Sequence, residues 1–130
     1  MSYLLDTHVW LWMLAEPARI RADLLAELAN HRTRLLLSAA SSWEIAIKWA
    51  LGRLALPVPP ASFVPSRMQR TGVTGLAVEH VHALHVATLP PHHRDPFDRL
   101  IIAQARIERL TIVTVDPVFD AYDVPVIRAD

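Results

Sequence analysis

The stretch Tyr3-Leu4-Leu5-Asp6-Thr7 is a short apolar run that ends in an acid, directly before residues with helical spacing. The stretch Thr111-Ile112-Val113-Thr114-Val115-Asp116 repeats this pattern near the other end of the chain. Short runs of β-branched and apolar residues predict buried strands. We therefore expect each of these two strands to place a carboxylate at its own carboxyl end.

Strands and helices are expected to alternate along the rest of the chain. Further strands are predicted at 34–37, 73–78 and 124–127, and helices at 7–13, 19–31, 43–51, 79–88 and 97–109. The proline-rich segment 56–65 is predicted to be irregular, with a helical turn at 66–70. Such alternation predicts a parallel sheet covered on both faces, in which ligands bind outside the carboxyl ends of the strands.

Length and composition limit the class of protein. The 130 residues predict one domain, 1–130, that can bury a sizeable core. The chain has no cysteine, which excludes disulfides, thiolate metal sites and cysteine nucleophiles. Its formal net charge is zero, so nothing attracts nucleic acid to the chain as a whole. Neither a signal peptide nor a membrane span is apparent, which predicts a cytoplasmic location without membrane contact.

Four acids are expected to meet at one edge of the sheet. Asp6 and Asp116 end strands, Glu44 follows the second strand, and Asp98 lies in the first turn of the helix after Pro96. Carboxylates that converge repel one another, so their charge must be neutralised by protonation or by a cation. Mg²⁺ or Mn²⁺ is the oxygen-seeking cation for such a site, and carboxylate-held ions can activate water at a phosphodiester.

Each acid also has a simpler interpretation when it is taken alone. Asp6 and Asp116 fit helix N-caps or turn formers. Glu44 fits the third position of a capping box. Asp98 is favoured by the helix dipole, although Asp95 competes for the same explanation as the N-cap residue. These interpretations stay open for each acid, but they do not explain why all four acids are expected at the same edge of the sheet.

Four segments, in this order, resemble the PIN-domain ribonucleases, and most closely the VapC-type toxins of toxin–antitoxin pairs. They are Leu4-Leu5-Asp6-Thr7-His8, Ser41-Ser42-Trp43-Glu44-Ile45, Leu89-Pro90 with residues 93–105, and Thr114-Val115-Asp116. The string at 95–105, Asp-Pro-Phe-Asp-Arg-Leu-Ile-Ile-Ala-Gln-Ala, is the most specific of them. The resemblance implies an α/β, PIN-like three-layer α/β/α domain with a five-stranded, mainly parallel sheet.

The resemblance also implies a metal-dependent endoribonuclease that acts on RNA, forms a homodimer and is inhibited by a cognate antitoxin protein. Carried over residue by residue, the catalytic and metal-binding acids are Asp6, Glu44, Asp98 and Asp116, with Asp95 as an additional candidate ligand and Mg²⁺ or Mn²⁺ as cofactor. The alternative is a catalytically silent module of the same fold that only binds a protein, but all four acids are present. A small-molecule phosphatase would need a glycine-rich loop after a strand, and none of the three glycines provides one.

Other side chains are candidates for supporting roles. Arg94, Arg99 and Lys48 lie near the predicted acids and could contact RNA phosphates. Lys48 follows Glu44 by four residues, so an ion pair within one helix is an equal alternative. The histidines lack the spacing of a zinc motif, and structural or surface roles are expected for them. The four tryptophans are expected in the core or a subunit interface rather than as base-stacking platforms.

Overall fold

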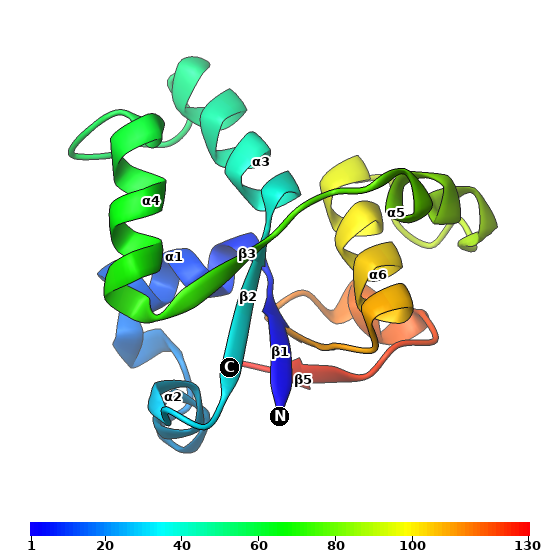
Figure 1. Cartoon of the computed structure of the whole chain (residues 1–130), viewed down its shortest axis with the longest axis horizontal. Helices are drawn as coiled ribbons and strands as arrows, with labels where there is room; N and C mark the ends of the chain where they lie inside the picture. Colours follow the sequence, from blue (N-terminus) through cyan, green and yellow to red (C-terminus); the bar gives the residue numbers. More distant parts are fainter.

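In the computed structural model, which describes residues 1–130, five parallel strands form the middle layer of the molecule (Figure 1). The strands are β1 (Ser2–Leu5), β2 (Arg34–Ser38), β3 (Val73–Leu76), β4 (Thr111–Thr114) and β5 (Val126–Arg128). Their order is β3-β2-β1-β4-β5, and every neighbouring pair is parallel. The strand order reverses direction between β1 and β4. In sheets of this kind, ligands bind outside the carboxyl ends of the strands at that point.

Helices cover both faces of the sheet, which confirms the predicted three layers. On one side are α1 (Thr7–Ala15), α2 (Ala22–Ala29), α3 (Ala39–Ala50) and α4 (Pro60–Thr71), and on the other are α5 (His80–His85) and α6 (Pro96–Glu108). Short 3₁₀ helices are η1 (Pro17–Arg19), η2 (Val86–Thr88) and η3 (Pro117–Ala121). Among these helices none combines the length and apolarity that crossing a bilayer demands.

The central strand β1 is buried on both faces, which explains its uninterrupted apolar sequence. Successive side chains of a strand point to opposite faces. Tyr3 and Leu5 therefore join the core that contains Trp10 under α1. Leu4 joins the second core, which contains Ile101 of α6. The strand is held from both sides, so the residue that follows it has a fixed position.

α3 begins directly at the end of β2, four residues before the predicted start at 43. Ser38 is its N-cap, and the Ser38 hydroxyl accepts a hydrogen bond from the Ala40 backbone N–H at 3.0 Å. The strand and the helix thus share one junction residue. This direct junction places the buried face of α3 next to α1 and α6, which α3 also contacts.

The proline-rich segment 56–65, predicted to be irregular, instead contains the first turns of α4. Pro60 occupies the first helical position, where a backbone N–H has no partner within the helix in any case. Pro65 removes one hydrogen bond inside the helix, but Phe63 and Val64 are buried against the core. Burial of these side chains therefore outweighs the local preference of the prolines.

Candidate metal centre

Asp6 is a buried carboxylate at the carboxyl end of β1. It precedes α1 in the N-cap position, yet its side chain makes no capping hydrogen bond. Instead, its Oδ2 accepts a hydrogen bond from the Thr114 hydroxyl of β4 at 2.8 Å. Burial raises the pKa of Asp6, and the charge of Glu44 raises it further, against the lowering effects of Thr114, His8 and the Thr7 N–H. The capping interpretation therefore does not account for Asp6.

Glu44 lies on the buried face of α3 and is 3% exposed. Its Oε2 is 2.6 Å from the Nζ of Lys48, whereas its Oε1 is buried without a hydrogen-bond partner. No capping box forms, because α3 begins at Ala39 and Glu44 lies beyond the first turn. Leaving a buried charged oxygen unpartnered is costly, so Oε1 is a candidate ligand for a further cation.

The pKa of Asp98 is affected by the charges of the other acids at this edge of the sheet. Its pKa is raised to about 8, first by burial and then by the charges of Asp6, Asp95, Glu44 and Asp116. The structure therefore brings the four predicted acids and Asp95 to one edge of the sheet. Asp95 has a separate structural role, because its Oδ1 caps α6 by accepting two backbone N–H groups at 2.8 and 3.2 Å.

Asp116 follows β4 and shares a neighbour with Asp98. Its Oδ1 caps η3 by accepting the Val118 N–H at 2.9 Å. His93 Nε2 lies 2.7 Å from Asp98 Oδ2 and 3.6 Å from Asp116 Oδ2. These three side chains each offer a ligand atom within 4.8 Å of the others, which is close enough to hold one metal ion. His93, for which the sequence predicts a structural or surface role, is therefore also a candidate ligand.

The loop that carries His93 is held in place by Arg99 and Tyr122. The Tyr122 hydroxyl accepts a hydrogen bond from the His93 backbone N–H at 2.8 Å. The guanidinium of Arg99 donates, at 3.0 to 3.3 Å, to the carbonyl oxygens of Pro90, Val86 and Leu89. Arg99, predicted as a phosphate contact, therefore uses its guanidinium to clamp the loop. The sequence could not reveal this, because the carbonyls come from residues 86–90.

The other two candidate phosphate contacts have different surroundings. Lys48 forms the ion pair with Glu44 that its spacing allows. Burial lowers the pKa of Lys48, but the pair with Glu44 and the charges of Asp95 and Asp98 raise it by more, so the pKa is raised overall. Arg94 is exposed in the loop before α6. Of the three, only Arg94 is presented to solvent without a hydrogen bond or ion pair to the rest of the chain.

The donor set fits a hard divalent cation. The site offers carboxylate oxygens from α3, from α6 and from the residues that follow β1 and β4, and one imidazole nitrogen. Mg²⁺ and Mn²⁺ prefer oxygen ligands of this kind. The buried, unpartnered Oε1 of Glu44 and the repulsion that acts on Asp98 are the two observations that make a bound cation favourable.

Comparison with known proteins agrees with the fold. Residues 3–125 match the model of the PIN domain family. The chain is 32% identical over 115 residues to Ribonuclease VapC22 of Mycobacterium tuberculosis, covering 88% of this chain and 87% of that protein. It is 48% identical over 71 residues to Ribonuclease VapC16 of the same organism, covering 52% of this chain but only 50% of that protein.

A solved structure has the same fold over its full length. The structure of VapBC2 from Rickettsia felis, bound to a DNA fragment from its promoter, matches with a TM-score of 0.76 over 100% of both chains. The sequence identity is 16%, so this likeness concerns the fold alone.

Proposed function

The chain belongs to the PIN domain family, and from this membership and the clustered acids we propose that it is a metal-dependent endoribonuclease. We further propose that it acts as the toxin of a toxin–antitoxin pair in the cytoplasm. The observation that carries the proposal is the convergence of Asp6, Glu44, Asp98 and Asp116 where the strand order reverses. The relatives named as ribonucleases support RNA as the substrate.

We assign metal binding and catalysis to Asp6, Glu44, Asp98 and Asp116. When bound there, Mg²⁺ or Mn²⁺ supplies a Lewis acid for a phosphoryl oxygen and lowers the pKa of a water molecule. The Thr114 hydroxyl orients the carboxylate of Asp6, as hydrogen-bond partners of metal ligands commonly do. Because that water is the nucleophile, no serine or cysteine is needed.

His93 and Asp95 have positioning roles in this proposal. His93 Nε2 lies 2.7 Å from Asp98 Oδ2, and this hydrogen bond fixes the direction of the Asp98 carboxylate. Asp95 fixes the first turn of α6 through its capping bonds, and so sets the position of Asp98. We therefore treat Asp95 as support for the ligands rather than as a ligand.

Removal of divalent metal is expected to abolish RNA cleavage. Without metal the clustered acids give the cleavage site a net negative charge, which repels the phosphodiester until a cation is bound. The measurement is cleavage of labelled RNA by the purified protein in Mg²⁺, in excess EDTA, and after Mg²⁺ is added back. Ca²⁺ should bind but support turnover poorly, because its coordination geometry is looser. Full activity in EDTA would contradict the proposal, and so would an inactive protein in Mg²⁺ or Mn²⁺.

Partner proteins are proposed from the apolar side chains that remain exposed. Trp43 of α3 and Leu51, the C-cap residue of α3, are 59% and 62% exposed, and Val81 and Leu84 of α5 are 52% and 71% exposed. Association with another chain would remove such apolar side chains from water, which is favourable. We propose that a second copy of the chain and an antitoxin protein cover them. Trp10, in contrast, is fully buried in the core.

Co-expression is expected to reveal the antitoxin. The product of the small open reading frame that we expect just upstream should co-purify with this chain and suppress its RNA cleavage. An arginine from that protein could satisfy two carboxylate oxygens of the acidic cluster at once. Failure both to co-purify and to inhibit would remove the toxin–antitoxin assignment, whereas the nuclease assignment is tested separately by the metal experiment.

A further inference from the structure

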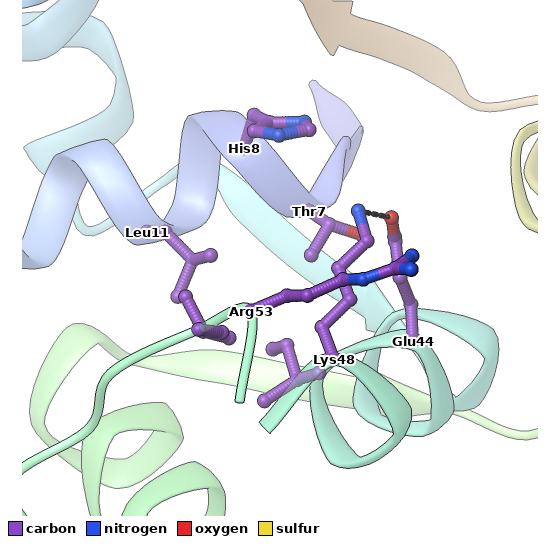
Figure 2. A pocket seen from close by; sticks show the side chains of 8 residues that line it. Thr7, His8, Leu11, Glu44, Lys48 and Arg53 are labelled. Atoms are coloured by element: carbon purple, nitrogen blue, oxygen red, sulfur yellow. Dashed lines mark hydrogen bonds and ion pairs between the residues drawn. The ribbon is translucent and has the colours of Figure 1, made fainter. Parts of the chain in front are cut away.

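A pocket lies directly beside the acidic cluster, between α1 and the carboxyl end of α3 (Figure 2). Its volume is about 240 Å³. It shares Glu44 with the acidic site and is also lined by Thr7, which directly follows Asp6, and Lys48 and Arg53 add two cations to its lining. A molecule bound at the acids can therefore extend into this pocket, whose lining carries positive charge where the acids carry negative charge.

Gly52 places Arg53 in this pocket. Gly52 has a φ of 72°, the left-handed conformation that ends helices and that glycine adopts without strain. The Arg53 backbone N–H then donates to the Lys48 carbonyl at 2.8 Å, and the Gly52 N–H donates to the Trp49 carbonyl at 3.0 Å. The chain thus turns back at the end of α3 and returns Arg53 alongside Lys48.

The two cations of the pocket differ in the partners they already have. Lys48 is neutralised by Glu44 at 2.6 Å, as the dashed line in Figure 2 marks. Arg53 forms no ion pair with any carboxylate of the chain and is exposed to solvent. Figure 2 shows its side chain extending across the pocket in the direction of Glu44. Arg53 is therefore the cation of this pocket that is available to bind an anionic group of a ligand.

The rest of the lining suits the uncharged part of a ligand. Leu11 of α1 and Leu54, next to Arg53, form part of an apolar wall. A site with one apolar wall and one free guanidinium fits an amphiphilic ligand better than a bare anion. The volume lies just below the range of about 300–1,000 Å³ found for pockets that hold drug-sized molecules, so it suits a single nucleotide unit.

We propose that this pocket binds the nucleotide next to the scissile phosphodiester of the RNA, with the Arg53 guanidinium on that nucleotide's phosphate. The inference rests on the ribonuclease function proposed above. Guanidinium matches phosphate through two parallel hydrogen bonds. The sugar or base lies against Leu11 and Leu54. Because Glu44 borders both spaces, consecutive phosphates of one strand occupy the acidic cluster and the Arg53 pocket.

The test compares Arg53→Gln with Arg32→Gln, a matched loss of charge. Arg32 is exposed in the turn before β2, at the opposite edge of the sheet from the acids. Binding of a short fluorescein-labelled single-stranded RNA is measured in Ca²⁺ from about 50 to 200 mM KCl. Arg53→Gln should bind about tenfold more weakly at the lowest salt, and the slope of log affinity against log salt should fall by about 0.7. Arg32→Gln should change neither value.

Two further measurements separate the effect of the charge on RNA binding from effects on metal binding and on binding of a protein partner. Arg53→Lys keeps the charge and should restore the salt slope. Mn²⁺ affinity, measured by calorimetry without RNA, should be the same for Arg53→Gln and wild type, because Arg53 is not a ligand.

If wild type cleaves RNA but Arg53→Gln keeps the wild-type RNA affinity and salt slope, this inference fails and the ribonuclease function stands. If Arg53→Gln loses only the antitoxin, the pocket belongs to a protein partner and the inference is again wrong. If wild type neither binds nor cleaves RNA, both proposals fail.

Discussion

Replacing Asp98 with asparagine is expected to reduce RNA cleavage by about a thousandfold or more, and also to stabilise the metal-free protein. The loss of activity follows from weaker binding of the cation, whose stabilisation of the transition state is worth several kcal/mol at 1.36 kcal/mol for each tenfold change in rate. The gain in stability follows from the environment of Asp98, whose pKa is raised to about 8. Loss of a capping acid would instead reduce stability, so the two results together distinguish a repelled metal ligand from a helix cap.

The gain in stability should depend on pH. The folded chain holds the Asp98 proton more tightly than the unfolded chain does, because the pKa rises from 3.8 to about 8 on folding. The contribution of Asp98 to the free energy of unfolding is therefore fully present below about pH 4 and is lost as the pH rises toward 8. Asparagine carries no charge, so the stability of Asp98→Asn relative to wild type should be a few kcal/mol higher at about pH 8 than at about pH 4. Urea denaturation in EDTA at both pH values measures this difference.

Asp23→Asn is the matched control for this experiment. Asp23 also lies in the first turn of a helix, α2, but its side chain is 80% exposed and pairs only with Arg21. The helix dipole favours such an acid by about 0.3–1 kcal/mol, so its removal should cost a little stability. If Asp98→Asn behaves in the same way and retains cleavage, Asp98 is only a first-turn acid.

The second large effect concerns metal affinity, which is expected to rise about a hundredfold between pH 6 and pH 8. A cation must displace the proton that Asp98 holds below its pKa of about 8, and one released proton changes affinity tenfold for each pH unit below that pKa. Calorimetric titration with Mn²⁺ in buffers of different ionisation enthalpy measures both the affinity and the released proton. An affinity independent of pH, with no proton released, would show that the ion binds elsewhere.

The position of the acids could be predicted from the sequence because parallel strands impose it. Asp6 directly follows a strand, and Asp116 follows β4 after one intervening residue, so pairing β1 with β4 brings both to one edge. Asp98 could be placed because Pro96 marks the start of its helix. Local sequence signals and the topology of the sheet were sufficient here, since each acid lies within two residues of a strand end or within the first turns of a helix.

The supporting residues could not be predicted in this way, because long-range contacts decide their roles. His93 lies in a loop whose course depends on Arg99 and on Tyr122, a residue 29 positions away. Gly52 signals the end of α3 in the sequence, but the pocket that Arg53 enters is completed by Leu11 of α1. The start of α4 at Pro60 likewise depends on burial against distant residues.

The most direct test of the central assignment is to locate Mn²⁺ in crystals of the protein by anomalous diffraction. The four acids meet at the carboxyl edge of β1 and β4, and the buried Oε1 of Glu44 lacks any partner within the chain. We predict an anomalous peak bound by the carboxylates of Asp6 and Asp98, lost in crystals of Asp98→Asn. A peak at another position, or none at the acids under conditions in which Mn²⁺ supports RNA cleavage, would contradict the account.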